Sequence, residues 1–256
     1  MIHDDHALAR DLATEAGALL LRLRAESGFA DVRTLRDTGD RESHVCITEA
    51  LARQRPGDAV LSEEGKDDLG RLDADRVWII DPLDGTYEYG EEGRSDWAVH
   101  VALWERDADG TGRLTAGAVA LPAQGRTLST AEPLTLPPLP DPSQIRMTAS
   151  RTRPPAFLDR LVEEVEPDVR VMPIGSAGAK VAAVLLGDVD AYVHAGGQYE
   201  WDSAAPVAVA LAAGAHASRI DGSPLTYNNE NTLLPDILVC HPDLAPTLLA
   251  GIRAVS

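Results

Sequence analysis

The chain has 256 residues, of which 44% are hydrophobic, enough apolar material for one large domain or for two halves that share a core. Its 41 acidic residues outnumber its 23 lysines and arginines, which gives a formal net charge of -18. Most of the surface therefore repels nucleic acids and anionic membranes, so we expect neither of them as a partner.

The two cysteines, Cys46 and Cys240, are too few for a disulfide framework and lack the spacing of a zinc site. We expect buried thiols in a reducing compartment. The N-terminal stretch MIHDDHALARDLATEAG lacks the basic start and apolar centre of an export signal, and the sequence has no run of 18 apolar residues. These patterns predict a soluble cytoplasmic protein.

The chain begins with helical periodicity. Leucines at helical spacing predict a helix over residues 5–26. A second helix is expected to start at Asp40, whose side chain would cap it, and to end near Arg55. The apolar segment 59–61 follows as a short strand, which places Glu63 at a strand's exit.

The next elements indicate an antiparallel sheet. An apolar run, VWII at residues 77–80, is followed by alternating apolar residues over 97–103. The turn sequence DADGTG then leads into RLTAGAVAL, and a further glycine leads into RTLST. Short turns between strands predict a hairpin-connected meander.

The segment EPLTLPPLPDPS, residues 132–143, holds five prolines and cannot supply the amides of a central strand. It predicts an α+β half over residues 1–132, a linker at 133–143 and an α/β half over 144–256. In the second half we expect strands near residues 145–148, 169–172, 189–194, 216–220 and 236–240, and helices at 155–165, 177–186, 203–213 and after Pro242. The 203–213 helix is apolar on every side and should lie between layers.

The stretch VWIIDPLDGTYEY, residues 77–89, places Asp81 and Asp84 at the end of a strand. Two carboxylates ~4 Å apart repel by roughly 4 kcal/mol at an effective dielectric near 20, so a cluster of them needs protons or cations. Oxygen ligands alone favour Mg²⁺, whose coordination shell is commonly completed by a substrate phosphate. Gly85 leaves room for a ligand, and the amides of Gly85 and Thr86 can bind phosphate oxygens.

Other interpretations of the D-x-x-D-G pattern stay open at this point. Asp and Gly are common in acidic surface turns. A calcium loop fits less well, because Leu83 and Gly85 occupy positions that need oxygen donors. Phosphatases with a covalent aspartyl intermediate carry two acids two residues apart, whereas Asp81 and Asp84 are three apart.

Three motifs together resemble those of the inositol monophosphatase-like superfamily, whose members are magnesium-dependent, lithium-sensitive phosphatases. The motifs are SEE at 62–64, DPLDGT at 81–86 and WDSAA at 201–205, and each is expected to follow a strand. The resemblance covers essentially the whole chain. It implies an α/β protein with the layered αβαβα fold of the sugar phosphatases.

The resemblance also implies a site that holds two or three Mg²⁺ ions. Glu63, Asp81 and the Leu83 carbonyl would hold one ion. Asp81, Asp84 and Asp202 would hold a second, so that Asp81 bridges the two. Glu64 is expected to support these ligands rather than to bind metal.

Catalytic roles follow from the same positions. Asp40 would pair with Thr86, and Thr86 and Glu63 would hold the metal-activated water that attacks phosphorus in line. The alternative for Asp40 is a plain N-cap, and the two roles can coexist. Trp201 is expected to pack and to fix Asp202 at the start of a buried helix.

Further residues resemble the CysQ-type 3'(2'),5'-bisphosphate nucleotidases of this superfamily. They are Tyr87-Glu88-Tyr89 after the D-G-T, Ser62, GSAGAK at 175–180 and HAGGQYEWDSAAP at 194–206. This implies a phosphoric monoester hydrolase that removes the 3'-phosphate of 3'-phosphoadenosine 5'-phosphate, and of its sulfated form, in sulfur assimilation. The substrate would be a small phosphate ester.

The resemblance implies a set of substrate-binding residues: Glu63, Leu83, Asp84, Gly85, Thr86, Gly175, Ser176, Lys180, His194 and Asp202. Two of them have structural alternatives. Lys180 can be a solvated helix lysine, and His194 can be a structural histidine after a strand.

Two departures from the family pattern stand out. The segment GEEGRSD, residues 90–96, is unusually acidic, which weakens the case for a second phosphate site, and Ala215 replaces a common glycine. The alternatives are an inositol 1-phosphate or fructose 1,6-bisphosphate phosphatase on the same site, or a non-catalytic metal-binding protein. A homodimer is left open, because no apolar stripe identifies an interface.

Overall fold

The computed structural model describes residues 4–141, 143–166 and 168–256. Its first two helices, α1 (Asp5–Ser27) and α2 (Val32–Gln54), form a hairpin. Asp31 caps α2 by accepting a hydrogen bond from the Thr34 amide at 3.1 Å. The expected helix start at Asp40 is therefore wrong. Asp40 lies inside α2, so its side chain does not cap the helix.

The first sheet has the order β1-β2-β3-β4-β5. Its strands are β1 (Ala59–Ser62), β2 (Arg76–Asp84), β3 (Ala98–Arg106), β4 (Gly112–Leu121) and β5 (Arg126–Ser129). The expected meander is confirmed for β2 to β5, which pair antiparallel, while β1 pairs parallel with β2. Short helices lie in the connections between these strands: η1 (Leu69–Asp73), α3 (Thr86–Tyr89) and η2 (Pro122–Gln124).

The second sheet has the order β7-β6-β8-β10-β9. Its strands are β6 (Gln144–Ser150), β7 (Asp168–Ile174), β8 (Ala191–Ala195), β9 (His216–Ser218) and β10 (Asp236–Cys240). β6 runs parallel to β7 and β8, whereas β10 runs antiparallel to β8 and β9. The accompanying helices are α4 (Leu158–Glu164), α5 (Ala177–Leu185), α6 (Glu200–Ala212), η3 (Pro242–Leu244) and α7 (Ala245–Val255).

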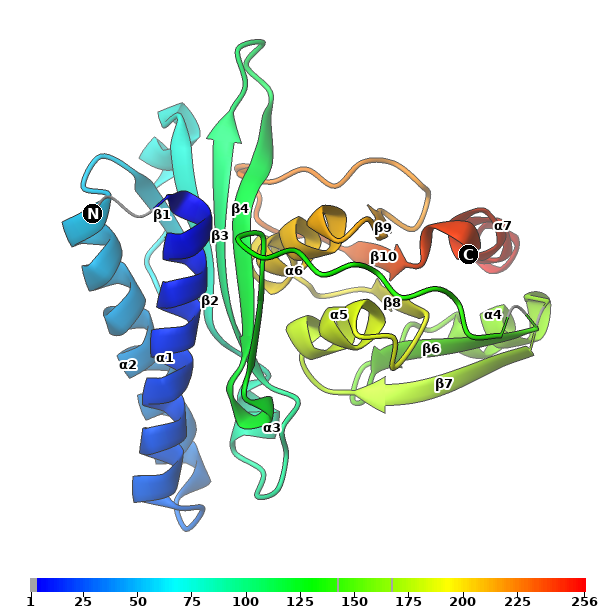
Figure 1. Ribbon diagram of the computed structural model, residues 1–256, viewed down its shortest axis with the longest axis horizontal. Coiled ribbons are helices and arrows are strands. Elements are labelled where there is room, and N and C mark those ends of the chain that lie inside the picture. The colour runs from blue at the N-terminus through cyan, green and yellow to red at the C-terminus, as the bar shows by residue number, and fades with distance from the viewer. Residues whose placement is uncertain (1–3, 142, 167) are drawn as a thin grey trace.

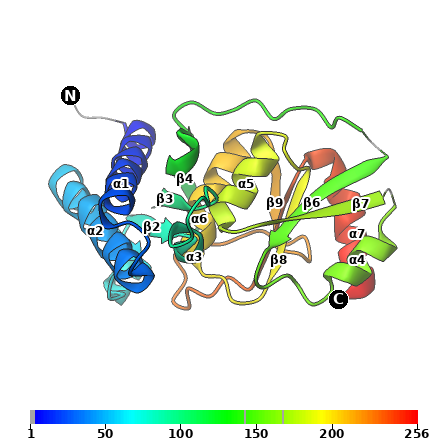
Figure 2. The same ribbon diagram turned by 90° about the horizontal axis from the view of Figure 1, so that it is seen from below.

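The elements stack in five layers, as expected for an αβαβα fold (Figures 1 and 2). Helices α1 and α2 cover one face of the first sheet, α5 and α6 lie between the sheets, and α4 and α7 cover the outer face of the second sheet. One apolar cluster fills each of the first and last interfaces, and a third joins both sheets around α5 and α6.

Strand β2 shows why its sequence is apolar without alternation. Trp78 and Ile80 point to the helices α1 and α2, and Val77 and Ile79 point to the central cluster. All four side chains are fully buried. A strand covered on both faces buries every side chain, so its sequence becomes a continuous apolar run.

Helix α6 lies between the layers, as its apolar surface predicts. It contacts β2, β3 and β4 on one side and α5 and β9 on others. The proline-rich segment connects the two sheets, with Pro142 outside the described residues. Since α6 belongs to the second half of the chain and packs on the sheet of the first, the two halves share a core. Their boundaries as separate domains stay a prediction.

Two expectations from composition can be compared with the fold. Cys240 is buried and Cys46 is partly buried, and both are free thiols. Within the described ranges, none of the helices has both the length and the apolarity needed to cross a bilayer.

The contact between α6 and β4 generates a stability prediction. A Cβ at Gly117 would lie 2.6 Å from the Ala208 Cβ, which cannot move without displacing α6. We expect Gly117→Ala to lower the free energy of unfolding by about 1–3 kcal/mol through overpacking. Chemical denaturation measures this change. Gly57→Ala, which meets no atom within 4 Å, is the control, and an equal effect of both substitutions would contradict the packing argument.

Candidate active site

The end of β2 carries two aspartates of the predicted metal site, Asp81 and Asp84. The pairing register with β3 shifts between Asp81 and Asp84, so this end of the strand is irregular. The Ser43 hydroxyl donates to the Pro82 carbonyl at 2.7 Å, and the Leu83 amide donates to Asp81 Oδ1 at 3.0 Å. Asp81 is 1% exposed and Asp84 is 7% exposed, so the interpretation as an acidic surface turn is wrong.

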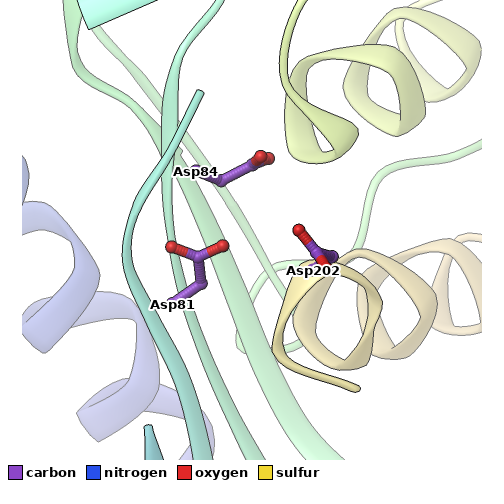
Figure 3. Close-up of side chains that lie close together, drawn as sticks. All are labelled: Asp81, Asp84 and Asp202. Atoms are coloured by element: carbon purple, nitrogen blue, oxygen red, sulfur yellow. The ribbon is translucent and has the colours of Figure 1, made fainter. Parts of the chain in front are cut away.

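Asp202 joins these residues from the other half of the chain (Figure 3). It lies in the first turn of α6, where its Oδ2 accepts a hydrogen bond from the Tyr199 amide at 2.6 Å. Each of Asp81, Asp84 and Asp202 offers one carboxylate oxygen, and these oxygens lie within 4.8 Å of one another. We call these three residues the acidic triad.

Asp84 is held by donors from two layers. The Gly178 amide at the start of α5 donates to Asp84 Oδ2 at 2.7 Å, and His100 Nε2 lies 3.1 Å from the same oxygen. Burial opposes ionisation of Asp84, but His100, Lys180 and the Gly178 amide together hold its pKa below the usual value. Asp84 is therefore the member of the triad that stays ionised most easily.

His100 links the triad to Trp201. Its Nδ1 lies 3.1 Å from the Trp201 carbonyl oxygen, while the Trp201 ring stacks on Tyr199 at 4.8 Å between centroids. Trp201 thus packs, as expected, directly beside Asp202. His100 was not among the predicted site residues, although a histidine inside the apolar strand WAVHVALW is a signal of a buried polar contact.

Glu63 completes the acidic cluster at its rim. Residue 63 is exposed as a whole, but its carboxyl group lies close enough to Asp81 and Asp202 for their charges to act on it. In the absence of cations, this proximity favours the protonated form of Glu63 and Asp81.

Burial and mutual repulsion raise the pKa values of Asp81, Glu63 and Asp202. The pKa of Asp81 lies well above its usual value because the group is buried and faces Glu63 and Asp84. Burial and the charge of Asp202 raise the pKa of Glu63 to about 7, and burial and the charge of Asp84 raise that of Asp202 to about 6. Such a cluster requires protons or cations, and its all-oxygen donor set suits a hard divalent cation.

Thr86 and Asp40 lie next to the cluster. The Thr86 hydroxyl donates to the Leu83 carbonyl at 3.1 Å, and Asp40 Oδ1 lies 3.5 Å from the same hydroxyl. Burial and the charge of Glu64 raise the pKa of Asp40 to about 7. The expected neighbourhood of Asp40 and Thr86 is present, and their catalytic roles stay a prediction.

The cluster opens into a cavity of about 250 Å³. Every predicted metal ligand and substrate-binding residue lines it: Glu63, Asp81, Leu83, Asp84, Gly85, Thr86, Gly175, Ser176, Lys180, His194 and Asp202. The structure thus brings the predicted residues together, and their individual functions stay predictions.

Gly85 and Gly175 shape this cavity through their missing side chains. Gly85 has φ +83°, and a Cβ there would lie 2.8 Å from the Ser176 Cβ. A Cβ at Gly175 would lie 2.4 Å from the Glu88 side chain. Ser176 in turn caps α5 by accepting a hydrogen bond from the Ala179 amide at 2.9 Å.

Lys180 lies inside the cavity wall, so the alternative of a solvated helix lysine is wrong. It is 3% exposed, and its Nζ donates to the carbonyls of Gly175 and Ser176 and lies 5.2 Å from the centroid of the Tyr192 ring. Burial lowers the pKa of Lys180 to about 8. Its charge faces the same space as the acidic triad.

His194, which lines the cavity, has a buried ring nitrogen that can accept a hydrogen bond. Its Nε2 lies 2.7 Å from the Gly196 carbonyl and must carry a proton to donate to it. Burial lowers the pKa of His194 to about 4, so Nδ1 carries a lone pair at neutral pH. Among the described residues, buried Nδ1 has no hydrogen-bond partner.

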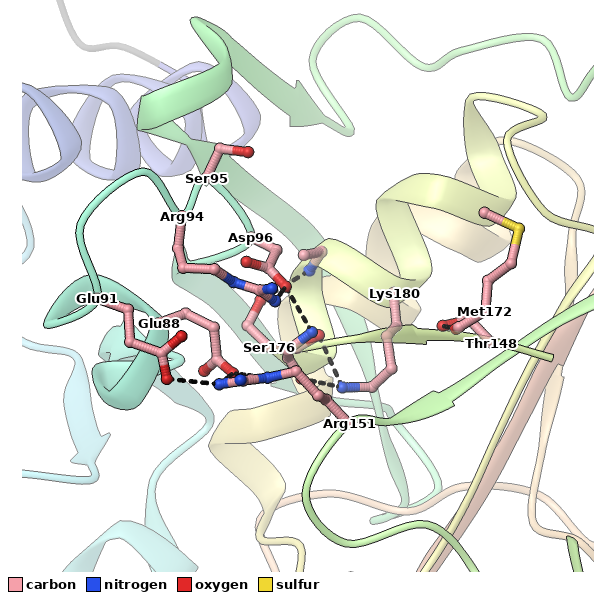
Figure 4. Close-up of polar contacts among 12 residues, drawn as sticks. Glu88, Glu91, Arg94, Ser95, Asp96, Thr148, Arg151, Met172, Ser176 and Lys180 are labelled. Atoms are coloured by element: carbon pink, nitrogen blue, oxygen red, sulfur yellow. Dashed lines mark hydrogen bonds and ion pairs between the residues drawn. The ribbon is translucent and has the colours of Figure 1, made fainter.

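The acidic segment 90–96 is balanced by arginines (Figure 4). Arg151, at the end of β6, pairs with Glu88 at 2.9 Å and with Glu91 at 2.8 Å. Arg94 pairs with Asp96, which also accepts a hydrogen bond from the Gly175 amide. These contacts tie the segment after α3 to the second half of the chain. The other departure, Ala215, is buried in the central apolar cluster and does not line the cavity.

The layered fold and the acidic triad between its two halves are features of a known protein family. The chain belongs to the inositol monophosphatase family, whose model matches residues 4–255. The predicted family and fold are thus confirmed. Members of this family are metal-dependent, in accord with a triad that could hold a metal ion.

Known proteins resemble the chain over nearly its full length. A 3'-phosphoadenosine 5'-phosphate phosphatase of Mycobacterium leprae is 53% identical over 98% of this chain and 94% of its own. The 3'(2'),5'-bisphosphate nucleotidase CysQ of Escherichia coli is 29% identical over 87% of this chain and 94% of its own. The solved structure of Mycobacterium tuberculosis SuhB has a TM-score of 0.72 at 27% identity, covering 98% of this chain and 96% of its own.

The raised pKa values give a stability prediction for protein freed of divalent cations. A carboxyl group whose folded-state pKa exceeds its unfolded value binds its proton more tightly in the folded state. Its contribution to stability is present at low pH and is lost as the pH rises through the folded-state pKa. For Glu63 this window runs from about pH 4.5 to about pH 7. We expect the melting temperature in EDTA to show this loss.

Glu63→Gln is the matched variant for that experiment, because it keeps the shape of the side chain and removes its titration. Its melting temperature in EDTA should fall less than that of the wild type across the window. Saturating Mg²⁺ should remove most of the difference. Parallel pH curves for the two proteins in EDTA would contradict the assigned electrostatics.

Proposed function

We propose that the protein is a Mg²⁺-dependent phosphatase that hydrolyses the 3'-phosphate of 3'-phosphoadenosine 5'-phosphate to give AMP and phosphate. Its sulfated form, 3'-phosphoadenosine 5'-phosphosulfate, would give adenosine 5'-phosphosulfate in the same way. The observation that carries the proposal is the acidic triad at the base of a cavity that also holds a buried lysine. The names of the Mycobacterium leprae and Escherichia coli relatives support the choice of nucleotide.

The donor set fits the metal that the proposal requires. Asp81, Asp84 and Asp202 would share the cations, with Glu63 and the Leu83 carbonyl at the rim of the site. Bound divalent cations would neutralise the carboxylates and stabilise the charge that develops on the phosphate and the leaving oxygen. Lys180 would add a positive charge on the side facing α5.

The protein's own groups would position the reactants. Glu63 and Thr86 can each accept a hydrogen bond from a water molecule, because the Thr86 hydroxyl hydrogen is directed to Leu83 or Asp40. A water held by both would be oriented for in-line attack on phosphorus. A protein that only stores metal has no need of the Asp40–Thr86 contact, which argues against the non-catalytic alternative.

The acidic triad generates a prediction about turnover. Asp81→Asn should lower kcat about 100-fold or more, since metal stabilisation of transition-state charge supplies several kcal/mol. The same substitution removes a buried repulsion, so the fold should stay intact, as circular dichroism can verify. Asp73→Asn, an exposed acid in η1, is the matched control. Undiminished phosphate release by Asp81→Asn would exclude a triad-centred mechanism.

Substrate choice is tested by phosphate release from a panel. We expect kcat/KM for 3'-phosphoadenosine 5'-phosphate to exceed the values for inositol 1-phosphate and fructose 1,6-bisphosphate, with activity that requires Mg²⁺ and declines as Li⁺ is titrated. A higher kcat/KM for inositol 1-phosphate would reject the nucleotide. An absence of hydrolysis for every member of the panel would reject the enzyme class.

A further inference from the structure

The cavity has an outer wall that no proposed catalytic step uses. This wall comes from the second sheet: Ser150 at the end of β6, Thr152 and Arg153 after β6, and Gly197 and Gln198 after β8. The acidic triad lies in the same cavity. When the reacting phosphate of a substrate is bound at the triad, the rest of the substrate therefore contacts this wall.

Arg153 carries an unengaged positive charge on this wall. Across the residues that the structure describes, no carboxylate forms an ion pair with Arg153, whereas its neighbour Arg151 pairs with Glu88 and Glu91. Lys180, the other cation of the cavity, is buried against backbone carbonyls. In a chain with 18 more acids than bases, an exposed arginine without an acidic partner is available to an anion from solvent.

The position of the Arg153 side chain directs it toward the cavity. The Arg153 amide donates to the Ser150 hydroxyl at 3.1 Å, which closes the turn after β6. Arg153 Nη1 lies 3.6 Å from the point that a Cβ of Gly197 would occupy. The guanidinium thus reaches the loop after β8 and lies close enough to His194 to contribute to its lowered pKa.

A separate observation indicates that a ligand binds here. His194 Nδ1 and Gln198 Oε1 are buried and, within the described part of the chain, have no hydrogen-bond partner. His194 is 4% exposed and Gln198 is 5% exposed, and both line the cavity. Buried polar groups are rarely left unpaired, so hydroxyl or amino groups of a bound ligand can satisfy them.

We propose that Arg153 binds the second phosphate of the substrate, the 5'-phosphate of a nucleoside 3',5'-bisphosphate, and is a specificity-determining residue. This inference rests on the proposed function and assigns the non-reacting end of the same cavity. The planar guanidinium suits a phosphate because it can donate two parallel hydrogen bonds. The acidic segment 90–96 opposes this phosphate less than its sequence suggests, because Arg151 pairs with Glu91 and Arg94 pairs with Asp96.

The experiment compares two substrates that differ only in the second phosphate, 3'-phosphoadenosine 5'-phosphate and adenosine 3'-phosphate. Arg153→Ala should lower kcat/KM for the bisphosphate about 10- to 100-fold, mainly through KM, because a charge-assisted contact is lost. It should leave kcat/KM for adenosine 3'-phosphate within about 2-fold. Arg153→Lys keeps the positive charge but cannot donate two parallel hydrogen bonds. It should recover part of the loss.

Arg160→Ala is the matched control, since Arg160 is an exposed arginine on α4 in the outer layer and its loss changes the net charge equally. It should leave both substrates unaffected. Equal losses for both substrates with Arg153→Ala, or no loss for either, would overturn the assignment of Arg153. Failure of the wild-type protein to hydrolyse the bisphosphate would instead overturn the proposed function.

Discussion

The repulsion among Asp81, Asp84 and Asp202 is the constraint on which the arrangement of the molecule depends. Carboxylates held this close in a buried setting do not gather without protons or cations, and the raised pKa values of Asp81 and Asp202 express that cost. Apolar packing has to hold the elements that carry them. The central cluster does so by joining both sheets around α5 and α6.

The donors around the triad come from both halves of the chain. The Gly178 amide and the Tyr199 amide, each at or near the start of a helix in the second half, bond to Asp84 and Asp202. His100 reaches Asp84 from β3 in the first half. A helix N-terminus favours a nearby negative charge, so α5 and α6 offset part of the repulsion that the acids create. Helices α5 and α6 thus both position the triad carboxylates and compensate part of their negative charge.

The strands and the cavity residues could be predicted because each motif is local. DPLDGT follows an apolar run that predicts a strand, and its combination with SEE and WDSAA separates a metal site from an ordinary acidic turn. The start of α2 was not predicted, since Asp31 and Asp40 are both good cap residues and the local sequence does not distinguish between them. Burial of Lys180, the contact of His100 with Asp84 and the free guanidinium of Arg153 depend on residues distant in sequence. A local sequence pattern cannot predict features that depend on distant residues.

The helix α6 has one further consequence, which concerns how this architecture can diversify. It anchors the reactive centre between two sheets, while the turns after β6 and β8 at the edge of the second sheet contribute only the distal rim. Substitutions in those turns can exchange one alcohol moiety for another without disturbing bond cleavage. A single ancestral scaffold can accordingly serve metabolites that share nothing beyond the ester being broken.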